Sequence, residues 1–98
     1  MLLTVPTDFE ILQALSDGRR NNATNIATEL DKNRSYINTR FPVLADYGLV
    51  ERVGPAERSG LYVITEKGQV AAANQAVYED EASEVDFETF LTRSVKRD

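Results

Sequence analysis

A chain of 98 residues is long enough for one compact domain with a short helical appendage, and too short for a second independent core. It contains no cysteine and no histidine, which excludes disulfides, Cys-ligated zinc, thiolate catalysis and every His-dependent triad. The formal net charge is −5, of which residues 1–68 carry −1 and residues 69–98 carry −4. Because the acidity belongs mainly to the C-terminal segment, it leaves nucleic-acid binding by the first segment open.

The basic residues comprise 8 Arg and 3 Lys, and with the acidic excess this bias fits a protein adapted to a salt-rich cytoplasm. An ordinary acidic protein fits the same composition equally well. No apolar run reaches the roughly 18 residues that a membrane-spanning helix needs, and no basic leader precedes a long apolar stretch. We therefore expect a cytoplasmic protein with no membrane partner.

The first helix is expected to begin near Thr7. Thr7 and Glu10 have the spacing of a capping box, in which each side chain accepts from the backbone N–H of the other residue. Ser16-Asp17-Gly18 is expected to end the helix, with the glycine in the left-handed conformation. The apolar residues 1–5 either lie against the body or fray. One buried face of the helix consists of Phe9, Ile11, Leu12 and Leu15.

A second helix is predicted over residues 24–30, and Asp31-Lys32-Asn33 breaks it. Asn33 suits the N-cap of a third helix, which closes at Asp46-Tyr47-Gly48. Pro42 either kinks this third helix or ends it near Phe41, and the pattern leaves both outcomes open. The core face of the third helix consists of Ile37, Phe41 and Leu44.

Residues 49–53 and 61–65 are short β-prone runs on either side of a loop with Gly and Pro, a pattern that predicts a hairpin. From Thr65, a suitable N-cap, through Tyr78 the chain is rich in alanine, which predicts a fourth, long helix. One side of that helix should carry Val70, Ala73 and Val77. A further helical face is formed by Phe87, Phe90, Leu91 and Val95.

The order helix, helix, helix, hairpin, helix predicts a mainly α fold with a β-hairpin (α+β), specifically a winged helix-turn-helix with a C-terminal helical extension. We assign residues 1–68 to a winged-helix DNA-binding domain and residues 69–98 to C-terminal helices for packing or dimerisation. Many helix-turn-helix proteins have glycine in the turn, whereas this chain has Asp31. Aspartate adopts the left-handed conformation more readily than most residues, so the turn can still form.

The third helix is expected to be the recognition helix, because its side opposite Ile37 is polar near the N-terminus. On this face Asn can bond adenine, and Ser and Thr can bond bases or phosphates. A small polar helix face is by itself more often merely solvated, and the whole element order favours DNA contact. The expected base contacts are Ser35, Asn38 and Thr39, with Tyr36 beside them; the expected phosphate contacts are Arg34, Arg40 and, in the wing, Arg58.

Two segments carry a resemblance to a known family: "LADYGLVERV", where the third helix runs into the first strand, and "GLYVITEKG", where the second strand runs into the next helix. Over about residues 8–68 the chain resembles archaeal winged-helix regulators, specifically the haloarchaeal group similar to the phage phi-H repressor. The resemblance implies a repressor-like, dimeric transcription regulator that recognises operator DNA in high salt. It therefore also favours the salt-adapted interpretation of the composition.

The sequence thus predicts a sequence-specific DNA-binding regulator whose partners are double-stranded DNA and a second copy of itself. The homodimer is expected to use the alanine-rich helix and the face of Phe87, Phe90 and Leu91, unless that face folds back on its own chain. The alternative function is a winged-helix protein-interaction module without DNA binding. We expect no enzyme, cofactor, metal or small-molecule substrate, because the carboxylates are scattered with no convergent nucleophile, and the sequence has no phosphate-binding glycine loop and no metal-ligand spacing.

Overall fold

The computed structural model describes residues 1–54, 59–82 and 86–95. These ranges form a mostly helical α+β domain with one antiparallel hairpin, and this confirms the predicted fold class at that level. The helices are α1 (Thr7–Ala14), α2 (Ala23–Leu30), α3 (Arg34–Asp46), α4 (Glu66–Ala73), α5 (Gln75–Glu79) and α6 (Phe87–Val95), and the strands are β1 (Val50–Val53) and β2 (Leu61–Ile64).

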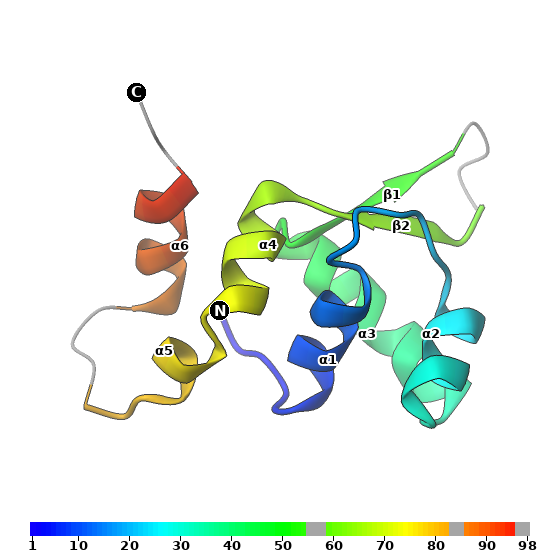
Figure 1. The fold of residues 1–98 in the computed structure, drawn as a ribbon, viewed down its shortest axis with the longest axis horizontal. Helices are drawn as coiled ribbons and strands as arrows, with labels where there is room; N and C mark the ends of the chain where they lie inside the picture. Colours follow the sequence, from blue (N-terminus) through cyan, green and yellow to red (C-terminus); the bar gives the residue numbers. More distant parts are fainter. Residues whose placement is uncertain (55–58, 83–85, 96–98) are drawn as a thin grey trace.

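The core lies where α1, α2, α3 and α4 meet, and the hairpin projects toward the same end of the molecule as α2 (Figure 1). The apolar positions spaced at helical period in the sequence supply this core, because each set falls on one side of its helix. In α3 the residues of the predicted core face, Ile37, Phe41 and Leu44, are all fully buried. The fully buried apolar residues include Phe9, Ile11, Leu12, Leu15, Ile26, Ile37, Phe41, Leu44, Leu49 and Leu91.

The hairpin pairs Val50 with Ile64 and Val53 with Leu61, and it is extended on one side by an isolated bridge between Asn21 and Tyr62. The N–H of Asn21 donates to the carbonyl of Tyr62 at 2.9 Å, and the reverse bond is 2.8 Å. The chain just before α2 therefore lies against β2 as a third, minimal strand. Sequence reasoning missed this bridge, because one residue pair leaves no period in the sequence.

The predicted capping box at Thr7 is wrong. Thr7 is buried inside the helix, the N-cap residue is Pro6, and no side chain caps it. The turn before α1 already supplies carbonyl acceptors, that of Thr4 for the N–H of Asp8 and that of Pro6 for the N–H of Glu10. Glu10 is therefore free of a capping role, and it forms an ion pair with Lys32 at 3.2 Å instead.

The predicted long helix after Thr65 is also wrong in its length. Thr65 does cap it, accepting from the N–H of Gly68 at 3.0 Å, but α4 ends at Ala73 and α5 begins at Gln75. Asn74 between them leaves the helical conformation (φ −130°, ψ 35°), and its side-chain amide donates to the carbonyl of Val70 at 2.7 Å. This local side-chain bond competes with the helix ladder. It breaks the predicted single face, and Ala73 is exposed.

The aromatic face of the last helix folds back on its own chain, which is the alternative to its use in dimerisation. Phe87 and Leu91 are buried, and α6 packs on α4. The ring centroid of Phe87 lies 5.1 Å from that of Tyr78 and 6.3 Å from that of Phe9. These contacts place α6 at the opposite end of the molecule from the hairpin (Figure 1).

The N-terminal residues lie against the body rather than fraying. The hydroxyl of Tyr47 accepts from the N–H of Leu2 at 3.0 Å, and that of Tyr78 accepts from the N–H of Leu3 at 2.8 Å. In the described ranges we find no helix with the length and apolar character needed to cross a bilayer.

Candidate nucleic-acid interface

The two helices α2 and α3 are joined by a tight turn whose geometry the local sequence explains. Asn22 and Asn33 cap the two N-termini, accepting from Asn25 N at 2.8 Å and from Tyr36 N at 3.0 Å. Asp31 takes the left-handed conformation (φ 54°, ψ 49°), and the N–H of Lys32 returns to the carbonyl of Ala27 at 2.9 Å. The expectation that aspartate replaces glycine at this turn is confirmed.

We predict that Asp31→Gly raises the free energy of unfolding by about 1 kcal/mol, since a side chain in the left-handed region is strained and a carboxylate opposes the dipole at the C-terminus of α2. The measurement is urea denaturation followed by circular dichroism. Asp31→Asn is the matched control, because it removes the charge and keeps a side chain that tolerates this conformation. An Asp31→Gly variant no more stable than Asp31→Asn would show that the conformation costs nothing here.

The outward side of α3 is polar and uncovered. Ser35, Asn38 and Thr39 are exposed, whereas Ile37 and Phe41 on the same helix are fully buried. The helix continues through Pro42 to Asp46, so the alternative that it ends near Phe41 is wrong. Pro42 is itself exposed, and water can reach the carbonyl of Asn38 that its ring leaves without a donor.

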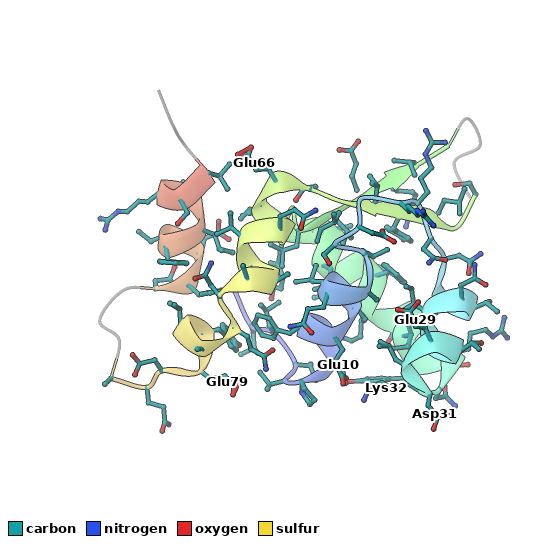
Figure 2. The ribbon with its side chains drawn as sticks, viewed as in Figure 1. Glu10, Glu29, Asp31, Lys32, Glu66 and Glu79 are labelled. Atoms are coloured by element: carbon teal, nitrogen blue, oxygen red, sulfur yellow. The ribbon has the colours of Figure 1, made fainter. Side chains whose placement is uncertain are left out.

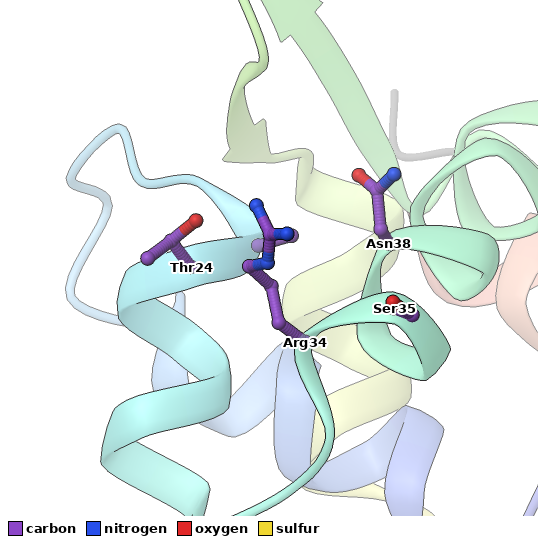
Figure 3. Close-up of a pocket in the computed structure, with 5 residues that line it drawn as sticks. Thr24, Arg34, Ser35 and Asn38 are labelled. Atoms are coloured by element: carbon purple, nitrogen blue, oxygen red, sulfur yellow. The ribbon is translucent and has the colours of Figure 1, made fainter.

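A cleft of about 140 Å³ opens between the first turns of α2 and α3. Its walls are Ala23, Thr24, Arg34, Ser35 and Asn38, and Arg34 and Asn38 extend toward the same side of α3 (Figure 3). Two helix N-termini and a guanidinium make such a cleft favourable for an anion. Sequence reasoning singled out Arg34, Ser35 and Asn38 and missed Thr24, which lies two residues after the N-cap of α2.

The basic side chains near this face differ in whether they already form an ion pair within the protein. In the part of the chain that the structure describes, ion pairs are formed by Lys32, Arg40 and Lys67, and Arg34 is not among them. The carboxylates of Glu29 and Asp31 lie near the C-terminal end of α2, whereas Glu66 and Glu79 lie on the side of α4 and α5 (Figure 2). The cleft is therefore lined by one cation, three neutral polar side chains and Ala23, with no carboxylate among the described residues of its walls.

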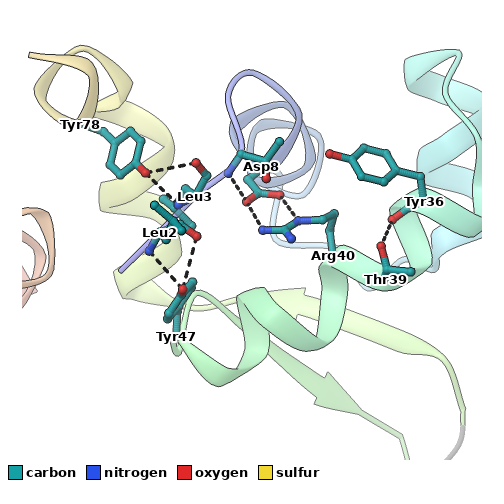
Figure 4. A network of polar contacts seen from close by, with 9 residues as sticks. Leu2, Leu3, Asp8, Tyr36, Thr39, Arg40, Tyr47 and Tyr78 are labelled. Carbon is teal, nitrogen blue, oxygen red and sulfur yellow. Dashed lines mark hydrogen bonds and ion pairs between the residues drawn. The ribbon is translucent and has the colours of Figure 1, made fainter.

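Arg40 does not point outward as predicted. Its guanidinium turns toward α1 and donates twice to the carboxylate of Asp8, from Nε to Oδ1 at 2.9 Å and from Nη2 to Oδ2 at 2.8 Å (Figure 4). The hydrogen bonds to Asp8 raise the pKa of Arg40, burial opposes this, and the charges of Asp8, Tyr36 and Tyr47 add to the increase. Because the guanidinium turns toward α1 and two of its N–H groups serve Asp8, we leave Arg40 out of the phosphate contacts.

The remaining predicted residues lie beside this face or beyond it. Tyr36 is 40% exposed, and its backbone carbonyl accepts from the hydroxyl of Thr39 at 2.6 Å. Arg58 lies outside the described residues. On the hairpin, the ring of Tyr62 stacks on Phe41 with centroids 4.4 Å apart, and the Nη2 of Arg52 donates to the Tyr62 hydroxyl at 2.9 Å. The stacking of Tyr62 on Phe41 fixes β2 to the buried side of α3, and the bond from Arg52 joins the two strands of the hairpin.

Comparison of the chain with family models, with curated proteins and with solved structures gave no match.

Proposed function

We propose that this protein is a winged-helix, sequence-specific DNA-binding transcription regulator of the repressor-like kind, with α3 as its recognition helix. The observation that carries the proposal is the uncovered polar face of Ser35, Asn38 and Thr39 on a helix anchored by fully buried Ile37 and Phe41. Such a face meets base edges when its helix enters the major groove. A tail or second element lying over it would have argued against this function, and α6 packs at the other end.

The arrangement around α3 supports the same proposal. The element order, with the minimal strand at Asn21 before α2 and the hairpin directly after α3, matches the order expected of a winged helix and so supports the proposal. The cleft at Thr24 and Arg34 suits a backbone phosphate, which would set the register of the base contacts. We keep Tyr36 as a flanking contact and Arg58 as a wing contact to phosphate.

The proposal includes three features inferred from the sequence alone: a homodimer on a two-fold operator, a cytoplasmic location, and kinship with haloarchaeal regulators adapted to salt. Phe87 and Leu91 are buried within one chain, so the homodimer would need another surface. The same burial weakens the alternative of a protein-interaction module, which relied on those residues being available to a partner.

We expect that selection from random double-stranded DNA will enrich one sequence, and that Asn38→Ala with Thr39→Ala will weaken binding to it. Removing a hydrogen bond to a base edge costs about 1–3 kcal/mol, so the affinity of the double variant should fall roughly tenfold or more. Fluorescence anisotropy across molar salt measures the affinity, and the stoichiometry of the complex reports the dimer.

Thr92→Ala is the matched control, because Thr92 is an exposed helical threonine on α6, away from the proposed interface. It should bind as the wild type does. Unchanged affinity and sequence preference in the α3 variant would remove the recognition role of this helix. Failure of the wild type to enrich any sequence, together with a stable protein partner in pull-down, would favour the interaction module.

A further inference from the structure

The carboxylate of Asp8 is fully buried and takes no part in the proposed DNA contacts. Three donors hold it: the N–H of Thr4 at 2.7 Å and the two guanidinium nitrogens of Arg40 at 2.9 and 2.8 Å (Figure 4). A buried ion pair is weak evidence of net stability, because desolvation offsets the attraction between the charges. Its geometry, however, is specific, since the planar guanidinium fork fits a carboxylate in one orientation.

Arg40 lies at the point where the backbone ladder of α3 is interrupted. Pro42 has no N–H, so the carbonyl of Asn38 lacks its usual donor four residues along. This gap separates the first turns of α3, which carry the exposed polar face, from the last turns, which Leu44 and the hairpin hold. The first turns therefore depend more on tertiary contacts for their orientation.

Two kinds of contact supply that orientation. Ile37 and Phe41 bury the inner side of α3, but apolar packing tolerates small shifts because it is not directional. The ion pair of Asp8 and Arg40 ties the helix to α1 through two parallel hydrogen bonds. Arg40 follows Thr39 directly and is two residues before Pro42 in α3.

We propose that Asp8 and Arg40 are positioning residues that set the rotation of α3 about its axis, and so determine how Ser35, Asn38 and Thr39 meet the base edges. This inference rests on the proposed DNA-binding function. It assigns to Arg40 a role in sequence selectivity without contact to DNA. The reason is geometric: base contacts need hydrogen-bond geometry, whereas phosphate attraction tolerates a small rotation.

The test compares wild type with Arg40→Lys, which keeps the charge and loses the fork, and with Asp8→Asn, which keeps the shape and loses the charge. The sequence selected by the wild type and an unrelated duplex are titrated with each folded variant. We expect affinity for the selected sequence to fall roughly tenfold, as for one misplaced base contact, and affinity for the unrelated duplex to stay the same.

Rescue separates positioning from general stability. Pro42→Ala restores a donor to the carbonyl of Asn38, so adding it to Arg40→Lys should recover much of the selectivity. Hydrogen exchange at residues 35–39 should rise in Arg40→Lys relative to residues 26–30 of α2. If the pair only stabilises the fold, both duplexes lose affinity equally, or exchange rises alike in both helices.

Four results would overturn the positioning role. They are an equal loss of affinity for both duplexes, an equal rise of exchange in α2 and α3, unchanged sequence selectivity, and loss of folding in both variants. The wild-type protein distinguishes failure of this inference from failure of the proposed DNA-binding function. If it enriches no sequence, the DNA-binding proposal itself fails; if it enriches one and the variants keep full selectivity, only the inference about Asp8 and Arg40 fails.

Discussion

Gly68→Ala is expected to destabilise the protein by about 3 kcal/mol or more, although alanine usually stabilises a helix interior by about 0.5–1 kcal/mol relative to glycine. A Cβ at Gly68 would overlap the carbonyl oxygen of Leu49 and lie 2.7 Å from Cγ1 of Ile64. The first of these is backbone and cannot rotate away. Relief therefore requires α4 to move away from the strand that follows α3.

The surroundings of Gly68 make that movement costly. The N–H of Thr65 donates to the carbonyl of Leu49 at 3.1 Å, its hydroxyl donates to the carbonyl of Gly48 at 2.6 Å, and Lys67 Nζ donates to the carbonyl of Tyr47 at 2.9 Å. Moving α4 outward would break these bonds together. We therefore expect the loss of stability to be accompanied by looser packing of α4 against residues 47–49, which join α3 to β1.

Urea denaturation with matched fluorescence and circular dichroism measures this effect. Ala73→Gly is the control, because Ala73 is exposed near the end of the same helix and should lose only about 1 kcal/mol through helix propensity. A Gly68→Ala variant as stable as the wild type would show that α4 does not pack on Leu49 as closely as described.

Arg40→Met is expected to cost about 3–5 kcal/mol, because it leaves the carboxylate of Asp8 buried with only the N–H of Thr4 as its partner. Asp8→Leu should cost less. The side chain of Arg40 is 17% exposed and can turn its guanidinium toward water, whereas that of Asp8 is 0% exposed. The two single variants therefore show which of the two charges is the more costly to leave without its partner.

A double-mutant cycle completes this experiment. With both charges replaced, no buried charge is left unpaired, so Asp8→Leu with Arg40→Met should be more stable than Arg40→Met alone by about 2 kcal/mol or more. Additive losses in the cycle would contradict a direct pair. Lys32→Met is the control, since Lys32 pairs with Glu10 where both side chains are partly exposed, and such pairs contribute about 1 kcal/mol or less.

Several features of the candidate interface could be predicted from the local sequence. The spacing of Ile37, Phe41 and Leu44 determined which side of α3 is buried, and therefore which side presents Ser35 and Asn38. The caps at Asn33 and Thr65 were also predictable, because a cap depends on residues within one turn of it.

The wrong predictions concern residues whose partners lie outside the local pattern. Thr7 and Glu10 have the spacing of a capping box, but the turn formed by residues 4–6 satisfies the first N–H groups of α1 before a side chain is needed. In the sequence Arg40 follows the exposed Thr39, and so it was predicted to face solvent. Its partner, the buried carboxylate of Asp8 on α1, lies 32 residues away in the sequence, and only the folded chain brings the two together.

The sequence by itself therefore determined the order of the elements from α1 to β2, the buried sides of α1 and α3 and the polar face of α3, because helical period, caps and turn residues act within a few positions. Tertiary structure alone decided the ion pair of Asp8 with Arg40, the bridge from Asn21 to Tyr62, the cleft at Thr24 and the packing of α6 onto α4. Each of these depends on the distance between segments remote in the chain. No local pattern encodes that distance, because packing of the whole core sets it.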